Sequence, residues 1–283
     1  MALGKIGIIG AGTMGNGIAQ VCAVVGLPVI MQDINETACA RGMAALASSL
    51  DRLVKKEKMN TAQKDAALAL IKTTTNPADL GDADYIIEAA TENLDLKLKL
   101  LKNISELAKP SAIIASNTSS ISITKLAASV KNPAQFVGMH FFNPVPLMQL
   151  VELIRGLQTN DATMAVAEGL AKQLGKTPIS VKNSPGFVVN RLLCPMINEA
   201  IFVYAEGLAS AEEIDNGMKL GTNQPIGPLA LADMVGLDTM LAVMEVFYND
   251  FKDSKYRPAP LLKEMVDAGY LGRKSKRGFY NYE

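Results

Sequence analysis

One histidine and a few carboxylates, serines and asparagines are the side chains that could move a proton in this 283-residue sequence. His140 is the single histidine, and an imidazole, with an ordinary pKa of about 6.5, suits acid–base chemistry near neutral pH. Glu152 lies in the apolar run Leu150 to Ile154, where an unpartnered carboxylate is costly to bury. Pairing with His140 would offset that cost and fix the imidazole tautomer. The sequence therefore predicts a His–Glu pair, against the alternative of a core histidine bonded to the backbone.

A glycine motif, Gly10-Ala11-Gly12-Thr13-Met14-Gly15, follows a short apolar run. In a dinucleotide-binding turn, Gly10 would allow the tight turn, Gly12 the close approach of a pyrophosphate, and Gly15 the packing of helix on strand. The helix that follows would offer unpaired N–H groups to the diphosphate. The bare motif is weak, and an ordinary glycine-rich turn is the alternative. Its position at the start of an α/β alternation favours a nucleotide site.

Asp33 lies 18 residues beyond Gly15, at the end of the second predicted strand. A carboxylate there accepts hydrogen bonds from adenosine ribose hydroxyls and repels a 2′-phosphate. The next residues, 34–36, are Ile-Asn-Glu, so no arginine follows directly. We therefore expect NAD rather than NADP as the cofactor. A plain turn or helix-capping aspartate is the alternative.

Two more polar segments follow apolar runs. Ser116-Asn117-Thr118-Ser119-Ser120 ends a predicted strand, and it could line a site or cap the helix that is expected after Ile123. Asn190 stands in an apolar helical start. Its amide could cap that helix or donate a hydrogen bond to a substrate.

The elements that must position these groups change character near Ser184. Before it, strand and helix signals alternate, which predicts a Rossmann-type α/β domain over 1–184, with a mostly parallel sheet and helices on both faces. After it, helical periods dominate, which predicts an all-α domain over 185–283. The expected strands are 5–9, 29–32, 85–89, 112–115 and 136–139. The expected helices of the first domain are 12–25, 35–59, 61–70 and 94–107. In the second domain we expect a helix over 188–206, one that starts at the capping box 210–213, further helices up to about residue 251, and a last helix after residue 260.

Composition excludes several classes of protein. The 28 basic residues balance 28 acidic ones, so there is no positive field for nucleic acid or anionic lipid. The longest apolar stretch, 21–31, has 11 residues, whereas a membrane-spanning helix needs about 20. Three scattered cysteines without CxxC spacing are typical of reduced thiols in a cytoplasmic protein. A strand signal from Lys5 leaves no room for a presequence, and we expect no metal site.

Taken together, the motifs resemble the L-3-hydroxyacyl-CoA dehydrogenase family. The glycine motif, the segment 116–120, His140-Phe141-Phe142-Asn143-Pro144 and the segment 184–191 occur in the family's order. The similarity covers nearly the whole chain, including 217–221 and the closing 278–280. The resemblance implies NAD-dependent interconversion of an (S)-3-hydroxyacyl-CoA thioester, with a four-carbon acyl group, and its 3-oxoacyl-CoA. It also implies a homodimer formed through the helical domain. Met234, Met240 and Met244 are compatible with such an interface, but the sequence favours buried core for each of them.

The resemblance also implies roles. His140 matches the acid–base, Glu152 its orienting partner, and Ser119 and Asn190 the donors to the reacting oxygen and thioester. Without it, Lys56 would be interpreted as a solvated helix end, and Glu92 with Lys97 as an ordinary helical pair. Matched NAD contacts are Gly10, Gly12, Thr13, Met14, Gly15, Asp33, Glu92, Lys97, Asn117, Ser119, Asn143 and Lys274; matched substrate contacts are Ser49, Lys56, Ser119 and Asn190. A dehydrogenase of free 3-hydroxy acids and a non-catalytic NAD-binding redox sensor remain as alternatives.

Overall fold

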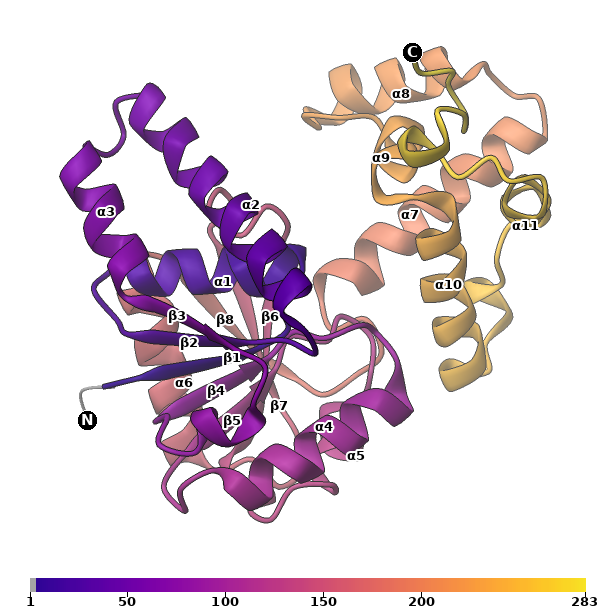
Figure 1. The fold of residues 1–283 in the computed structure, drawn as a ribbon. Coiled ribbons are helices and arrows are strands. Elements are labelled where there is room, and N and C mark those ends of the chain that lie inside the picture. The colour runs from indigo at the N-terminus through magenta and orange to yellow at the C-terminus, as the bar shows by residue number, and fades with distance from the viewer. Residues whose placement is uncertain (1–3) are drawn as a thin grey trace. The chain divides into compact units, whose positions relative to one another are not determined.

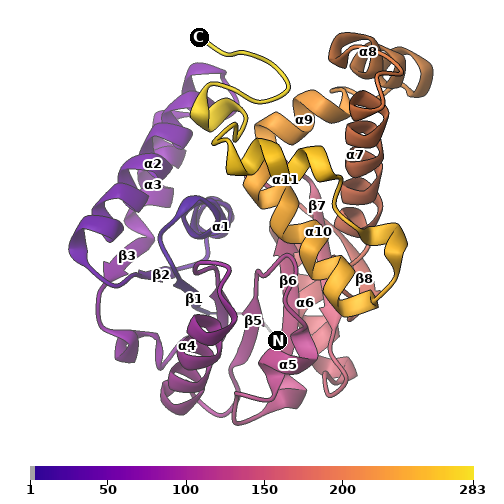
Figure 2. The same ribbon diagram turned by 90° about the vertical axis from the view of Figure 1, so that its right-hand side faces the viewer.

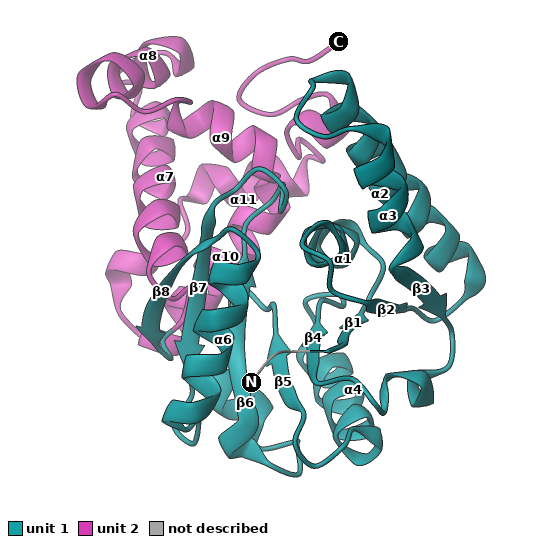
Figure 3. Ribbon diagram, turned by 90° about the vertical axis from the view of Figure 1, so that its left-hand side faces the viewer, with its two compact units in different colours: residues 1–184 teal, residues 185–283 magenta. Residues whose placement is uncertain are grey.

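The computed structural model describes residues 4–283 and divides into two compact units, Met1–Ser184 and Pro185–Glu283 (Figure 3). The N-terminal unit contains one eight-stranded sheet in the order β3-β2-β1-β4-β5-β6-β7-β8 (Figure 1). Its strands are β1 Ile6–Ile9, β2 Val29–Gln32, β3 Ile71–Thr74, β4 Tyr85–Glu88, β5 Ile113–Ser116, β6 Phe136–Phe141, β7 Leu150–Arg155 and β8 Thr177–Lys182. Its α-helices are α1 Thr13–Val24, α2 Glu36–Lys55, α3 Thr61–Ala69, α4 Leu94–Leu107, α5 Ile123–Ala127 and α6 Asp161–Gln173.

The first six strands are parallel, as expected for a chain that alternates strand and helix. Strands β2 and β4 flank β1, so the strand order reverses beside β1 and creates the switch point at which such sheets bind ligands. Strand β7 runs antiparallel to β6 and parallel to β8. Helices α1, α2 and α6 share a buried core with one face of the sheet, while α4 and α5 lie on the other face (Figure 1). The predicted fold class is confirmed.

Two strands, one helix and one helix end differ from the sequence-based expectation. Helix α6 was not predicted at all. Strands β3 and β8 were not predicted, because both are edge strands with exposed polar positions and lack a continuous apolar run. The helix expected to reach residue 59 ends at Lys55. Glu57 follows with φ at 55°, a left-handed conformation that cannot continue a right-handed helix.

The connection between β6 and β7 is held by a buried lysine. Lys176 Nζ donates to the carbonyl oxygens of Val145 and Met148 at 2.5 and 2.8 Å. Burial lowers the pKa of this lysine. Val145 is also buried, and its Cβ would lie only 2.9 Å from a Cβ placed on Gly17 of α1. The loop that follows His140 is thus fixed to the helix that begins at the glycine motif.

The C-terminal unit is helical, as predicted (Figure 2). Its α-helices are α7 Val189–Ala205, α8 Ala211–Thr222, α9 Pro228–Val235, α10 Leu237–Phe251 and α11 Pro260–Asp267. Ser210 and Glu213 form the expected capping box of α8. The closing segment is fastened to α9, since Asp233 accepts hydrogen bonds from the N–H groups of Phe279 and Tyr280, both at 3.0 Å. Within residues 4–283, no helix is both long and apolar enough to span a membrane.

Candidate active site

The glycine turn between β1 and α1 is built for a close-approaching ligand. Gly10 has φ at 99°, and a Cβ on it would lie 2.7 Å from the carbonyl oxygen of Ala89. A Cβ on Gly15 would lie 1.7 Å from the carbonyl oxygen of Gly10, so these two glycines are required by the protein itself. Gly12 is different, because a Cβ there would meet nothing within 4 Å. The space in front of Gly12 and the N-terminus of α1 is therefore available to a phosphate group.

Asp33 follows β2 and faces the same turn. Its Oδ2 accepts a hydrogen bond from the N–H of Ala11, and its Oδ1 from that of Ile34, both at 2.7 Å. Asn35, and not Asp33, caps α2 by accepting from the N–H of Ala38. The capping alternative for Asp33 is therefore wrong. Asp33 lines a cavity of about 440 Å³ that extends from the glycine turn along the start of α2.

His140 and Glu152 face each other across the antiparallel pair β6 and β7. His140 Nδ1 lies 2.8 Å from Glu152 Oε2. Glu152 is fully buried and His140 is nearly so, with the ring centroid of Phe142 4.5 Å from that of the imidazole. A carboxylate at Nδ1 favours the proton on that nitrogen, so that proton exchange with a ligand falls to Nε2. The two residues that the sequence predicts as a pair are thus brought together.

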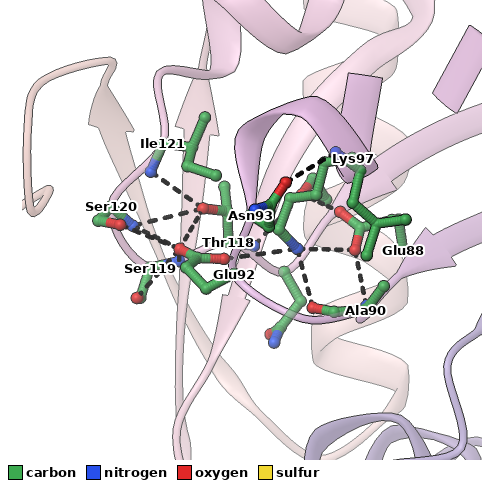
Figure 4. Close-up of polar contacts among 12 residues, drawn as sticks. Glu88, Ala90, Glu92, Asn93, Lys97, Thr118, Ser119, Ser120 and Ile121 are labelled. Carbon is green, nitrogen blue, oxygen red and sulfur yellow. Dashed lines mark hydrogen bonds and ion pairs between the residues drawn. The ribbon is translucent and has the colours of Figure 1, made fainter. Parts of the chain in front are cut away.

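A buried network of charges follows β4 and supports the next loop (Figure 4). Lys97 is 1% exposed, and its Nζ donates to Glu88 Oε1 at 2.7 Å and to the carbonyl oxygen of Ala90 at 3.1 Å. The same Nζ lies 3.4 Å from Glu92 Oε2. Desolvation opposes ionisation of Glu92, but Lys97 and hydrogen bonds from the segment 118–120 outweigh it and hold the pKa of Glu92 below its ordinary value. Lys97 is therefore part of the protein's own network rather than an ordinary surface helical pair.

Glu92 organises the polar segment that ends β5. Its Oε1 accepts from Thr118 Oγ1 at 2.6 Å, from the N–H of Ser119 at 2.9 Å and from Ser119 Oγ at 3.3 Å (Figure 4). Asn117 Oδ1 accepts from the N–H of Phe141 at 2.9 Å and so joins the ends of β5 and β6. The helix that begins at Ile123 is capped by Ser122. The alternative in which residues 116–120 cap that helix is therefore wrong.

The other predicted site residues are distributed over both units. Ser49 is half-buried on α2, and the exposed Lys56 ends that helix, seven residues further on; this spacing puts both on one face. Asn143 is exposed in the loop after β6 and precedes a cis peptide bond to Pro144. In the C-terminal unit, Asn190 is half-buried in the first turn of α7 and Lys274 forms an ion pair with Asp238.

Comparison with known proteins places this geometry in a family. Residues 5–184 match the model of the 3-hydroxyacyl-CoA dehydrogenase NAD-binding domain, and residues 186–282 match that of the C-terminal domain. The chain belongs to the 3-hydroxyacyl-CoA dehydrogenase family. It is 52% identical over 98% of its length to the whole of a probable 3-hydroxybutyryl-CoA dehydrogenase of Deinococcus radiodurans. It is 50% identical over 98% of its length to 99% of a 3-hydroxybutyryl-CoA dehydrogenase of Clostridioides difficile.

A solved structure supports the assignment. The (S)-3-hydroxybutyryl-CoA dehydrogenase of Ralstonia eutropha is 67% identical to this chain, and the superposition covers 100% of both chains with a TM-score of 0.97. The chain is thus an NAD-dependent oxidoreductase of the 3-hydroxyacyl-CoA dehydrogenase family. The residues present fit NAD, because the space before Gly12 is open and Asp33 lies beside it in a cavity.

Sequence reasoning missed two residues around this dehydrogenase site. Glu88 is fully buried and accepts from Ser116 Oγ at 2.6 Å as well as from Lys97. The signal was present, because Glu88 ends an apolar strand at the ligand-facing edge of the sheet, as Asp33 does. Arg41 lines the cavity beside Asp33. No local signal points to it, because it lies on α2 and not in the residues directly after Asp33.

Proposed function

We propose that this enzyme interconverts (S)-3-hydroxybutyryl-CoA and acetoacetyl-CoA, with His140 as the acid–base and Glu152 as the residue that orients it. The relatives from Clostridioides difficile and Ralstonia eutropha are 3-hydroxybutyryl-CoA dehydrogenases, which supports the four-carbon acyl group. NAD, when bound, accepts the hydride from substrate C3 or returns it. The residues that would hold it are those of the glycine turn together with Asp33.

The proton follows a separate path through the protein. During oxidation, the hydroxyl proton of the substrate passes to His140 Nε2, and the hydride lost from C3 would be taken up by bound NAD. The imidazolium that forms is stabilised by Glu152, whose carboxylate contacts the other ring nitrogen at 2.8 Å. During reduction, the same imidazolium protonates the developing alkoxide. Atoms and charge therefore balance, with His140 as the group that accepts and returns the proton.

Ser119 and Asn190 are proposed as neutral donors to the reacting oxygen and thioester. Donors aimed at an oxygen that gains negative charge stabilise the transition state more than the ground state. The contact of Ser119 Oγ with Glu92, at 3.3 Å, is the longest of those made by this carboxylate oxygen to residues 118–120. Redirecting this hydroxyl to a substrate therefore costs less than redirecting the others. Asn190 receives its role from the family resemblance.

The observation that carries the proposal is the buried contact between His140 and Glu152. General acid–base assistance contributes a factor of about 10²–10⁴ to the rate. We expect His140→Ala to lose turnover by about that factor while NADH binding, followed by fluorescence, remains close to that of the wild type. Unchanged turnover in this variant would refute the assignment.

The substrate class is tested by comparing thioester with acid. We expect NADH to form much faster from (S)-3-hydroxybutyryl-CoA than from free 3-hydroxybutyrate, because Ser49 and Lys56 are proposed to contact the CoA moiety. Equal rates would favour a dehydrogenase of free acids. A panel of acyl-CoA lengths would then define the acyl preference.

The oligomeric state and the cellular location of the protein are also proposed. We propose a homodimer formed through the helical unit, supported by an apolar groove of about 470 Å³ on that unit. Leu192, 71% exposed, is part of this groove. A cytoplasmic location is supported by Cys22, Cys39 and Cys194, which are buried and form no disulfide.

A further inference from the structure

The cavity beside Asp33 carries one charge of each sign. It is lined by Asp33 as the single anionic side chain and Arg41 as the single cationic one, together with Ala11, Gly12, Thr13, Asn16, Ile34, Asn35, Ala38, Gly42 and Ala45. The adenosine half of a dinucleotide bound at the glycine turn occupies this position. Both charges therefore face the part of the cofactor in which NAD and NADP differ.

The helical spacing on α2 explains why Arg41 faces the cavity. Ala38, Gly42 and Ala45 line it at intervals of four and three residues, which is one face of an α-helix. A Cβ on Gly42 would lie 2.6 Å from the carbonyl oxygen of Ala11. The small residues thus let α2 approach the glycine turn closely, and Arg41 comes with it. Arg41 is exposed, and no acidic side chain within residues 4–283 forms an ion pair with it.

We propose that Arg41 is the residue that binds the 2′-phosphate of NADP, and that the cofactor preference of this enzyme is set by the opposition between Arg41 and Asp33. Asp33 accepts from the ribose hydroxyls of NAD and repels a 2′-phosphate. A guanidinium binds phosphate through paired N–H groups and keeps its charge at any working pH. The inference depends on the family's NAD site and is independent of the proton-transfer roles of His140 and Glu152.

The test is a double-mutant cycle on the cofactor specificity of acetoacetyl-CoA reduction. Arg41→Ala should lower kcat/KM for NADPH about tenfold and change that for NADH less than about threefold. Asp33→Ser, which keeps an acceptor for the N–H of Ala11, should raise kcat/KM for NADPH at least about tenfold. Adding Arg41→Ala to Asp33→Ser should remove the gain in kcat/KM for NADPH. Adding Arg41→Lys to Asp33→Ser should retain part of that gain.

Two controls make the result interpretable. Lys72→Ala removes one exposed positive charge from β3, outside the cavity, and should leave the NADPH to NADH ratio unchanged. Calorimetric titration with 2′-AMP reports binding without turnover, and we expect the affinity to rise in Asp33→Ser and to fall again when Arg41→Ala is added. Thermal unfolding verifies that each variant is folded.

Three outcomes would overturn the proposal. Equal losses for NADH and NADPH in Arg41→Ala would mean that the guanidinium contacts the adenine ring instead. If Arg41→Ala left kcat/KM for NADPH unchanged both in the wild type and in Asp33→Ser, the guanidinium would contact neither the 2′-phosphate nor the adenine ring. A shift of the ratio in Lys72→Ala as large as that in Arg41→Ala would mean that the general positive field, and not a contact, is responsible.

Discussion

At the scale of single residues, the enzyme depends on two carboxylates whose burial needs a partner. Glu152 and Glu88 are both fully buried. Glu152 contacts His140, and Glu88 accepts hydrogen bonds from Lys97 and Ser116. Burying an isolated carboxylate costs several kcal/mol even after relaxation, about the whole stability margin of some domains. The charges are therefore retained in pairs, and removing one member has effects beyond its own contact.

Glu152→Gln tests the orienting role. Glutamine can still accept a hydrogen bond from His140 Nδ1 but does not stabilise an imidazolium, so we expect turnover to fall by less than in His140→Ala. The pH profile of kcat should change as well, because the charge beside the titrating ring is gone. Steady-state kinetics across pH measure both effects. Wild-type activity in this variant would remove Glu152 from the proposed mechanism.

Glu92 predicts a pH dependence of stability with a definite sign. Its pKa is lower in the folded protein than in the unfolded chain, so it stabilises the fold above the ordinary glutamate pKa of about 4.3 and loses that contribution as the pH falls through the lower folded value. Glu92→Gln should flatten the fall of Tm in this acidic window. Glu264→Gln, an exposed carboxylate on α11, serves as the control. A slope as steep in Glu92→Gln as in the wild type would contradict the effect ascribed to Lys97 and residues 118–120.

At the scale of elements, the turn from β1 to α1 separates glycines required by the fold from one required by the ligand. Gly15→Ala places a Cβ against the carbonyl of Gly10, and overpacking of this kind costs about 1–3 kcal/mol or more. Gly12→Ala meets no protein atom, so its stability cost should stay below about 1 kcal/mol while NADH affinity falls. Thermal unfolding and NADH fluorescence titration, done on both variants, check the contrast. Tight NADH binding by Gly12→Ala would mean that the pyrophosphate is bound elsewhere.

At the scale of the whole molecule, the two units have separate hydrophobic cores. The glycine turn, Asp33, His140 and Glu152 belong to the N-terminal unit, and Asn190 and Lys274 to the C-terminal one. The helical unit also exposes apolar side chains, and the groove that contains Leu192 is almost without polar residues. An apolar surface of this kind is typical of a protein interface.

Leu192→Asp tests the proposed homodimer. A carboxylate in the centre of an apolar interface lacks a partner, so we expect dimer dissociation to become at least about a hundredfold easier. Sedimentation over a concentration series measures this change. Leu157→Asp is the matched control, since Leu157 is 86% exposed on the N-terminal unit. A wild-type mass at all concentrations in Leu192→Asp would place the interface elsewhere.

The sequence by itself determined the alternation of strands and helices, the glycine turn, the carboxylate of Asp33 after the second strand and the solitary His140. These features are local, because periodicity, capping and turn chemistry act over a few residues, and so the chain order alone reveals them. The edge strands β3 and β8 escaped prediction for the same reason: their local patterns are polar and short.

Only the tertiary structure decided which distant residues meet. The antiparallel register of β6 and β7 sets His140 opposite Glu152, and a shift of one residue would turn one of them to the other face of the sheet. The network of Glu88 and Lys97, and the approach of Arg41 to the Asp33 cavity, likewise arise from packing between elements. The cost of burying Glu152 unpaired did predict its contact with His140, but the other contacts depend on packing between elements that no local pattern encodes.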